Sequence, residues 1–166
     1  HLTGVFNRRQ LDVLLTDRIK AAKSKQPLSC VLLDINHFKA INDALGHVVG
    51  DEALKDASAI LKSCIRKGDV LARFGGDEFI ILTDIDNEAT LQDMSQRIRN
   101  AVQSFNSAKK RPYTLDFSIG YAVYHPNSGW DKKEFIAHVD ALMYENKASL
   151  SVSNSPMPNR NAAHMV

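Results

Sequence analysis

The chain has 166 residues, of which 44% are hydrophobic and 24% are charged, with 21 Lys and Arg against 19 Asp and Glu. This length and apolar content predict one folded domain and exclude a mostly disordered chain. The balanced charge gives no reason to expect binding to nucleic acid, and no apolar run approaches the ~20 residues of a membrane span. Two cysteines do not make a disulfide framework, so Cys30 and Cys64 are expected as buried free thiols.

The first half of the chain predicts three helices and one strand. Asn7 is a helix cap followed by apolar residues at helical spacing, and Pro27 would end that helix. An apolar run without alternation suits a strand buried on both faces. In order, the predicted elements are a helix from Asn7 to about Gln26, a strand at 28–35, a short helix at 38–45 that ends at Gly46, and a helix at 51–66.

The second half predicts a hairpin, two helices and further strands. Gly75 and Gly76 separate two strand-like runs and indicate a tight hairpin turn. The predicted elements are strands at 70–74 and 78–83, a helix from Asn87 to about Phe105, an alternating strand at 115–123 with one buried face, a helix from Asp131 to about Lys147, and a short strand near Ser149–Val152. We therefore expect an α/β sandwich over residues 1–153, with a mixed sheet of about five strands flanked by helices, and a disordered tail at 154–166.

Carboxylates interrupt the apolar strands at two points. Asp34 ends one strand, while Asp77 and Glu78 follow the paired glycines and precede another. A carboxylate at the end of a buried strand needs a cationic partner, and Mg²⁺ takes oxygen ligands from one or two carboxylates together with substrate phosphates. The alternative is an ordinary turn, in which Asp and Gly are common.

The segment from Asp34 to Asp51 carries polar residues around two helix ends. It fails as a calcium loop, because Phe38 and Lys39 stand where a ligand and a glycine are needed. Neither a P-loop nor a dinucleotide-binding glycine motif occurs in the sequence. The side chains could hold a nucleotide, with a lysine meeting phosphate and a carboxylate or amide meeting base edges, or they could be solvated helix caps. They are Lys39, Asn42, His47 and Asp51.

Five segments, in order, resemble the GGDEF family of diguanylate cyclases. Arg73 to Phe79 reads R-F-G-G-D-E-F and is similar to the hairpin that gives that family its name. The others are the opening L-T-G-V-F-N-R-R at 2–9, the stretch at 34–51, the S-I-G strand at 118–120 and the helix at 140–147. The resemblance covers residues 2–147 and implies a palm-like fold related to nucleotidyl cyclases and polymerases.

The resemblance also implies an activity and a site. Two GTP molecules would be joined into cyclic di-GMP with release of two pyrophosphates, in a homodimer whose two sites face each other. Mg²⁺ or Mn²⁺ would be held by Asp34, the Ile35 carbonyl and Asp77. The implied catalytic residues are Asp77 as the base, Lys39 and Glu78, and the implied substrate-binding residues are Asn42, His47, Asp51, Gly75, Gly76 and Lys147.

Arg66 and Asp69 add a second implied site. Their R-x-x-D spacing, nine positions before Gly75, resembles the family's inhibitory site for cyclic di-GMP. An Arg can grip a phosphate and an Asp can accept from guanine, and Arg97 or Arg99 would complete the site. The alternative is a helix C-terminal Arg and a turn Asp, which are both favourable there without a ligand.

The chain also departs from the family pattern. Asn36 replaces a frequent Asp, the Asp before the opening motif would precede His1, and Ser151 stands where a phosphate-binding Arg is expected. The last change keeps a second interpretation open, in which the domain is a GTP or cyclic di-GMP sensor with weak or no catalysis. A protein-interaction module without nucleotide is a third. Since the chain starts without Met or a signal peptide, we expect a cytoplasmic domain of a larger sensor protein, with membrane attachment only through a preceding region.

Overall fold

The computed structural model describes residues 2–153, so the tail expected at 154–166 lies outside the described residues. The first helix, α1, runs Arg8–Lys23 and begins as predicted at Asn7. Asn7 and Gln10 form a reciprocal capping box, in which each side chain accepts a hydrogen bond from the other's backbone N–H. The helix ends three residues before the predicted Gln26, because the chain turns through Lys25 with a positive φ of 70° rather than at Pro27.

Within residues 2–153, four strands form one antiparallel sheet in the order β2-β3-β1-β4. They are β1 (Ser29–Ile35), β2 (Val70–Arg73), β3 (Glu78–Thr83) and β4 (Phe117–Val123). The prediction of a mixed sheet was wrong, since β1 and β2 run parallel but β3 lies between them and pairs antiparallel with both. Beside β2, Phe6 makes an isolated parallel bridge to Ala72.

The predicted fifth strand is helix instead. The last helix, α5, runs Lys132–Ser153 and includes the whole segment Ser149–Val152. It begins with a second capping box, between Asp131 and Glu134, as the sequence predicted for Asp131. Residues 148–155 contain no Gly or Pro, so the sequence has no signal that would end the helix at the predicted Lys147.

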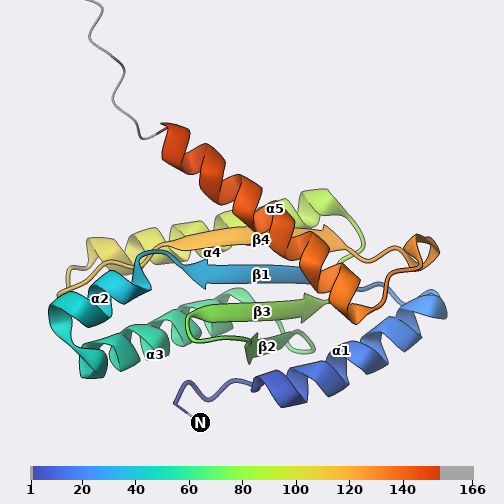
Figure 1. Cartoon of the computed structure of the whole chain (residues 1–166), viewed down its shortest axis with the longest axis horizontal. Coiled ribbons are helices and arrows are strands. Elements are labelled where there is room, and N and C mark those ends of the chain that lie inside the picture. Colours follow the sequence, from blue (N-terminus) through green and yellow to red (C-terminus); the bar gives the residue numbers. More distant parts are fainter. Residues whose placement is uncertain (1, 154–166) are drawn as a thin grey trace, which may run out of the picture.

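Helices cover both faces of the sheet (Figure 1). The helices α2 (Phe38–Leu45), α3 (His47–Cys64) and α4 (Glu88–Ser107) follow the predictions, although α3 begins four residues early because Gly46 both ends α2 and starts α3. A 3₁₀ turn spans Pro126–Ser128. Within residues 2–153, none of the helices combines the length and apolar content needed to cross a membrane.

The sheet separates two hydrophobic cores, because alternate residues of each strand point to opposite faces. Val31 and Leu33 of β1 join the core under α3 and α4, whereas Leu32 joins the core under α1 and α5. The two cysteines follow the same division and are free and buried as expected, Cys64 in the first core and Cys30 in the second. Burial raises the pKa of the Cys30 thiol to about 12.

Strand β4 is buried on both faces, so the expected single buried face was wrong. The cause is the close approach of α5 at Gly120. A Cβ atom there would lie 2.5 Å from the backbone nitrogen of Met143 and 2.5 Å from the carbonyl oxygen of Val139. Glycine at position 120 therefore lets α5 lie directly on the sheet, where it crosses β1 and β4 (Figure 1).

Candidate functional site

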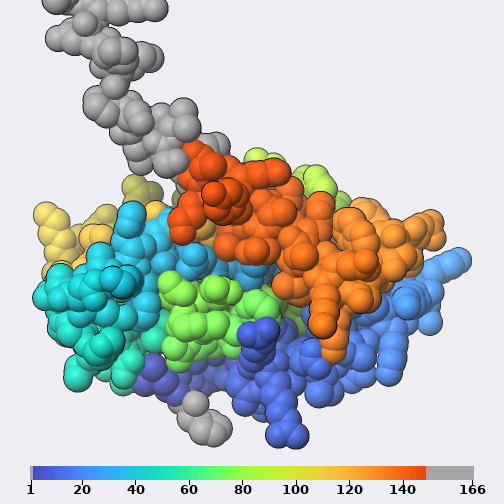
Figure 2. Space-filling view, in the orientation of Figure 1, coloured from blue at the N-terminus to red at the C-terminus, as the bar shows by residue number. Residues whose placement is uncertain are grey.

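The β2–β3 hairpin places Asp77 beside the end of β1. The predicted hairpin is confirmed, with residues 74–77 connecting the two strands. The Arg73 guanidinium donates to the Gly76 carbonyl through Nε at 3.1 Å and Nη2 at 2.7 Å. The Ile35 backbone nitrogen donates to the Asp77 carbonyl at 3.1 Å. These bonds fix the hairpin loop against the last residue of β1, on the face where Figure 2 shows the hairpin between the α2–α3 segment and α5.

The two glycines of this loop are not needed for its backbone conformation, because neither Gly75 nor Gly76 has a positive φ. A Cβ atom on Gly75 would lie 3.2 Å from Cδ of Glu78, which is a tight contact. A Cβ atom on Gly76 would meet nothing within 4 Å. The packing of the described residues therefore does not require glycine at position 76, and a surface without a side chain is open to a ligand there.

Asp34 carries the most perturbed carboxylate of this region. Its side chain is 20% exposed, and its Oδ2 accepts from Lys147 Nζ at 3.4 Å. Its Oδ1 is buried and has no hydrogen-bond partner. Burial, followed by the neighbouring negative charge of Asp77, raises the pKa of Asp34 to about 6, and Lys147 partly opposes that rise. A buried carboxylate oxygen without a hydrogen-bond partner is costly unless a cation meets it, so this atom is a candidate metal ligand.

The donor set fits the magnesium ion that the resemblance implied. Asp34 and Asp77 supply carboxylate oxygens, and the carbonyl of Ile35 lies between them in the chain. Within the described residues, no three His, Cys, Asp or Glu side chains are grouped as a metal cage. Mg²⁺ does not need such a cage, since it binds through one or two carboxylates and completes its coordination with water and substrate phosphates.

The corner between α2 and α3 brings Asn42 against Gly50 at the start of α3. A Cβ atom on Gly50 would lie 1.8 Å from Oδ1 of Asn42, so glycine at position 50 allows the Asn42 amide to lie on the start of α3. Asn42 is half-buried, whereas His47 and Asp51 are exposed. A hydrogen-bonding amide and an exposed carboxylate therefore occupy the same corner, and that they bind a base stays a prediction.

The structure does not bring Lys39 to the carboxylates of the β1 end. Its ammonium forms an ion pair with Asp43, one turn along α2, at 3.1 Å, and the Lys39 side chain is 90% exposed. Lys147, which comes from α5, is the cation in contact with Asp34. Of the two lysines predicted to bind phosphate, Lys147 therefore contacts Asp34, whereas Lys39 contacts Asp43 on α2.

Glu78 lies directly opposite Asp34 in the β1–β3 pairing. It is the first residue of β3, and it lines a cavity of about 760 Å³ between α1 and α5 together with Arg8 and Asp140. Burial and the charges of Asp77 and Asp140 raise the pKa of Glu78, and Arg8 lowers it. Opposite residues of an antiparallel pair point to the same face, so the structure places this predicted catalytic residue beside Asp34, on the face that α1 and α5 cover.

Arg66 and Asp69 form a compact turn after α3. The Asp69 carboxylate, only 2% exposed, accepts from the Arg66 backbone nitrogen at 3.0 Å. The Arg66 guanidinium is 60% exposed and pairs with both Asp69 and Asp84. The turn alternative thus accounts for the position of Asp69, while the Arg66 guanidinium remains accessible to an anion.

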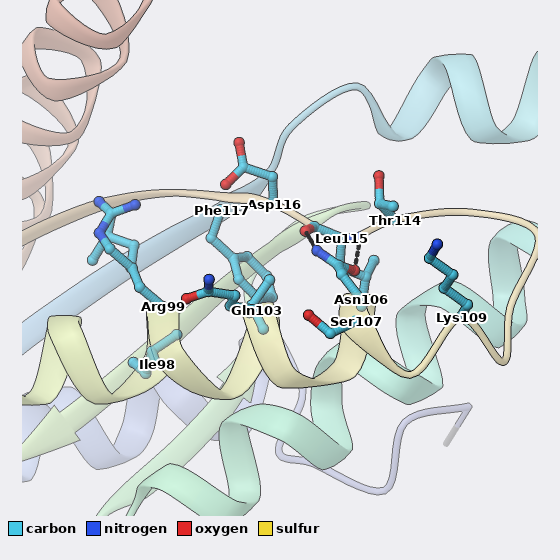
Figure 3. Close-up of a pocket in the computed structure, with 12 residues that line it drawn as sticks. Ile98, Arg99, Gln103, Asn106, Ser107, Lys109, Thr114, Leu115, Asp116 and Phe117 are labelled. Atoms are coloured by element: carbon cyan, nitrogen blue, oxygen red, sulfur yellow. Dashed lines mark hydrogen bonds between the residues drawn. The ribbon is translucent and has the colours of Figure 1, made fainter.

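Of the two arginines on α4, only Arg97 contacts this region. Its Nε donates to the carbonyl of Cys64, the last residue of α3, at 3.1 Å. Arg99 instead lines a cavity of about 600 Å³ between α4 and the segment before β4, as Figure 3 shows. The structure therefore favours Arg97 as the arginine that would complete an inhibitory site.

Sequence reasoning gave no role to two residues that organise these sites. Arg73 holds the hairpin loop, and Asp84 pairs with Arg66. Asp84 could have been singled out by the pattern that identified Asp34, since it is also a carboxylate directly after a buried strand. The Arg73 contact had no comparable signal, because an arginine in a hairpin can point in many directions.

Comparison with known proteins gives a consistent family. The family described as "Diguanylate cyclase, GGDEF domain" matches residues 1–151. The chain is 37% identical over 150 residues to the probable diguanylate cyclase DgcT of Escherichia coli K12, and this match covers 88% of this chain and 32% of the relative. It is 36% identical to the cyclic di-GMP phosphodiesterase PdeR of the same organism, over 88% of this chain and 22% of the relative. The chain thus spans at most about a third of the length of these relatives.

Solved structures agree with this match. The GGDEF domain of DgcB from Caulobacter crescentus, determined in complex with c-di-GMP, superposes with a TM-score of 0.80 at 26% sequence identity, covering 90% of this chain and 89% of that chain. With the family match over nearly its whole length, the antiparallel sheet flanked by helices and the Gly-Gly-Asp-Glu-Phe hairpin, the chain belongs to the GGDEF domain family.

Proposed function

We propose that this chain is a diguanylate cyclase domain, which condenses two GTP molecules into cyclic di-GMP and releases two pyrophosphates. The observation that carries the proposal is the buried, unpartnered Oδ1 of Asp34 beside Asp77 and Lys147. Such a group suits a site that holds a divalent cation and a triphosphate. The name of the relative DgcT and the c-di-GMP complex of DgcB support the same activity.

The residues at the β1 end have distinct roles in this reaction. Asp34, Asp77 and the Ile35 carbonyl would hold Mg²⁺ or Mn²⁺, which would offset the negative charge of the phosphates when bound. Asp77 accepts the proton of the ribose 3′-hydroxyl as that oxygen attacks the α-phosphorus. Lys147 stabilises the negative charge on the phosphates, and Lys39 joins it by exchanging its exposed contact with Asp43 for phosphate.

Guanine recognition is assigned to the α2–α3 corner. Asp51 accepts from the N1–H and N2–H₂ groups of guanine, and the Asn42 amide bonds to another edge of the same base, with His47 nearby. Adenine does not offer the two donors that Asp51 needs. Because each domain holds one GTP, two domains must face each other, most simply with twofold symmetry.

Product inhibition is assigned to the turn after α3. A phosphate of cyclic di-GMP would take the place of Asp84 on the exposed Arg66 guanidinium, with Arg97 beside it. The buried Asp69 carboxylate supports the turn in the absence of product, so its contact with guanine requires the turn to open.

The test is incubation of the purified domain with GTP and Mg²⁺, followed by chromatography for cyclic di-GMP and pyrophosphate. The matched control is Asp77→Asn, which keeps the shape of the side chain but removes the metal ligand and base. We expect synthesis in the first case and a loss of several orders of magnitude in the second. Equal rates would refute the assignment of Asp77.

The second candidate is a nucleotide sensor that signals without synthesis. It is favoured by Ser151, which stands where an Arg is expected, and by matches to proteins named cyclic di-GMP phosphodiesterases, NbdA of Pseudomonas aeruginosa and PdeR. The same incubation separates the two candidates: bound GTP or cyclic di-GMP without product formation supports the sensor. If the incubation gave no product and the domain bound no nucleotide, both candidates would be contradicted.

A further inference from the structure

Asn36 connects the end of β1 to β4 through three hydrogen bonds. Its backbone nitrogen donates to the Asp116 carbonyl at 2.8 Å, and its Nδ2 donates to Oδ2 of Asp116 at 2.8 Å. Its Oδ1 accepts from Ser118 Oγ at 2.6 Å. Ser118 is buried and lies opposite Asp34 in the β1–β4 pairing. The Asn36 side chain thus links the residue after Ile35 to the buried Ser118 of β4.

The backbone bond fixes the direction of the Ile35 carbonyl. The carbonyl of Ile35 and the N–H of Asn36 belong to one planar trans peptide, so they point in opposite directions. Because the N–H points to Asp116 before β4, the carbonyl points away from β4. The Ile35 nitrogen bonds to the Asp77 carbonyl on the other side of the strand. Rotation of this peptide would therefore turn the carbonyl away from its present direction.

His37, which follows Asn36, has an unfavourable backbone conformation. His37 has φ 58° and ψ 26°, in the left-handed region that a residue with a side chain adopts only where its surroundings enforce it. The chain changes direction there and enters α2, which carries Asn42. The bonds of Asn36 precede this residue directly, so they fix both the last peptide of β1 and the entry into α2.

We propose that Asn36 is a positioning residue, which acts through Asp116 and Ser118 to aim the Ile35 carbonyl at the metal. The inference rests on the proposed function, and it deepens it by naming residues that touch neither metal nor nucleotide. It requires an amide in one orientation, because one end of the side chain donates to a carboxylate while the other accepts from a hydroxyl.

This requirement allows a charge-neutral set of variants. Asn36→Leu removes both side-chain bonds at similar volume. The exchanged pair Asn36→Asp with Asp116→Asn keeps the net charge and restores a donor opposite an acceptor, with the remaining carboxylate oxygen free to accept from Ser118. Ser118→Ala removes one bond only and is the mildest change.

A matched control is available on α4. Asn106 donates to the Leu115 carbonyl at 2.8 Å and accepts from the Leu115 nitrogen at 2.9 Å, directly before Asp116 (Figure 3). Asn106→Leu therefore removes two hydrogen bonds to the same segment by the same substitution. Both of these hydrogen bonds go to Leu115 and neither goes to Asn36, so this variant reports the effect of loosening the segment alone.

The experiment measures Mn²⁺ binding by calorimetry in the presence of a non-hydrolysable GTP analogue, together with thermal unfolding of the metal-free domain. We expect Asn36→Leu to weaken Mn²⁺ binding at least tenfold and Ser118→Ala about threefold. The exchanged pair should return to within threefold of the wild type. Asn106→Leu should lower the unfolding temperature and leave Mn²⁺ affinity unchanged.

Three results would overturn the inference while leaving the proposed function intact: unchanged Mn²⁺ affinity in Asn36→Leu, an equal loss in Asn106→Leu, or no recovery in the exchanged pair. If the wild-type domain binds no Mn²⁺ under these conditions, the proposed function fails and this inference fails with it. Should Asn36→Leu not fold, Ser118→Ala and the exchanged pair decide the matter by the same measurement.

Discussion

Replacing Asp34 by Asn should stabilise the fold while it abolishes synthesis. The pKa of this carboxyl is raised from 3.8 to about 6, so the folded state binds its proton more tightly than the unfolded chain does. That advantage is present below the unfolded value and is lost as the pH rises through about 6. At pH 7.5 the ionised carboxylate therefore disfavours folding by about 2–3 kcal/mol, since one pKa unit corresponds to about 1.4 kcal/mol.

Asn is close in shape and carries no charge, so Asp34→Asn should recover much of this free energy. For a domain of this size the expected rise in unfolding temperature at pH 7.5 is about 5–10 °C. The gain should shrink towards pH 4, where the wild-type carboxyl is already protonated in the folded state. The assay is chemical or thermal unfolding of both proteins in metal-free buffer between pH 4 and pH 8.

Asp93, which is exposed on α4, provides the control. Asp93→Asn should leave the unfolding free energy within about 0.5 kcal/mol of the wild type at every pH. Addition of Mg²⁺ with a GTP analogue should stabilise the wild type but not Asp34→Asn. A stability of Asp34→Asn equal to that of the wild type, or a gain that does not depend on pH, would show that the burial of Asp34 and the charge of Asp77 do not act as argued.

Four further predictions follow from the packing and the site. Gly120→Ala should destabilise the fold by about 1–3 kcal/mol in urea unfolding, because the new Cβ meets the backbone of α5, and should lower activity by moving Lys147. Asp51→Ala should bring the kcat/KM values for GTP and ATP together; a retained preference would exclude its role in base recognition. Arg66→Ala should raise the inhibitory concentration of cyclic di-GMP without changing initial rates, whereas Asp84→Asn should lower it, and calorimetry with cyclic di-GMP checks both. Specific activity per domain should rise with protein concentration across about two decades, and a flat line from a monomer would contradict the two-domain mechanism.

Much of the fold could be predicted because the local signals are strong. The caps at Asn7, Asn87 and Asp131 and the glycine at position 46 each mark a helix boundary that the structure confirms. The errors concern relations between distant segments. Nothing in the sequence says that β3 inserts between β1 and β2, and the apolar residues near Ser149–Val152 suit a strand or a helix equally well.

The site shows the same division. The carboxylates at strand ends were visible in the sequence, but the contact between Asp34 and Lys147 joins residues 113 positions apart and depends on the packing of α5 at Gly120. Glu78 shows the same dependence, because its place directly opposite Asp34 comes from the register of the β1–β3 pairing. Its catalytic role stays a prediction.

The burial of both cysteines makes this domain convenient for site-specific labelling. Cys30 and Cys64 lie in separate cores, and a buried thiol such as Cys30, with its raised pKa, reacts slowly with maleimides and other thiol reagents. A cysteine introduced at Val13, which is exposed on α1, would therefore carry one fluorophore or spin label per domain without removal of the native residues. Distances between such labels in a pair of domains could then be measured directly during turnover.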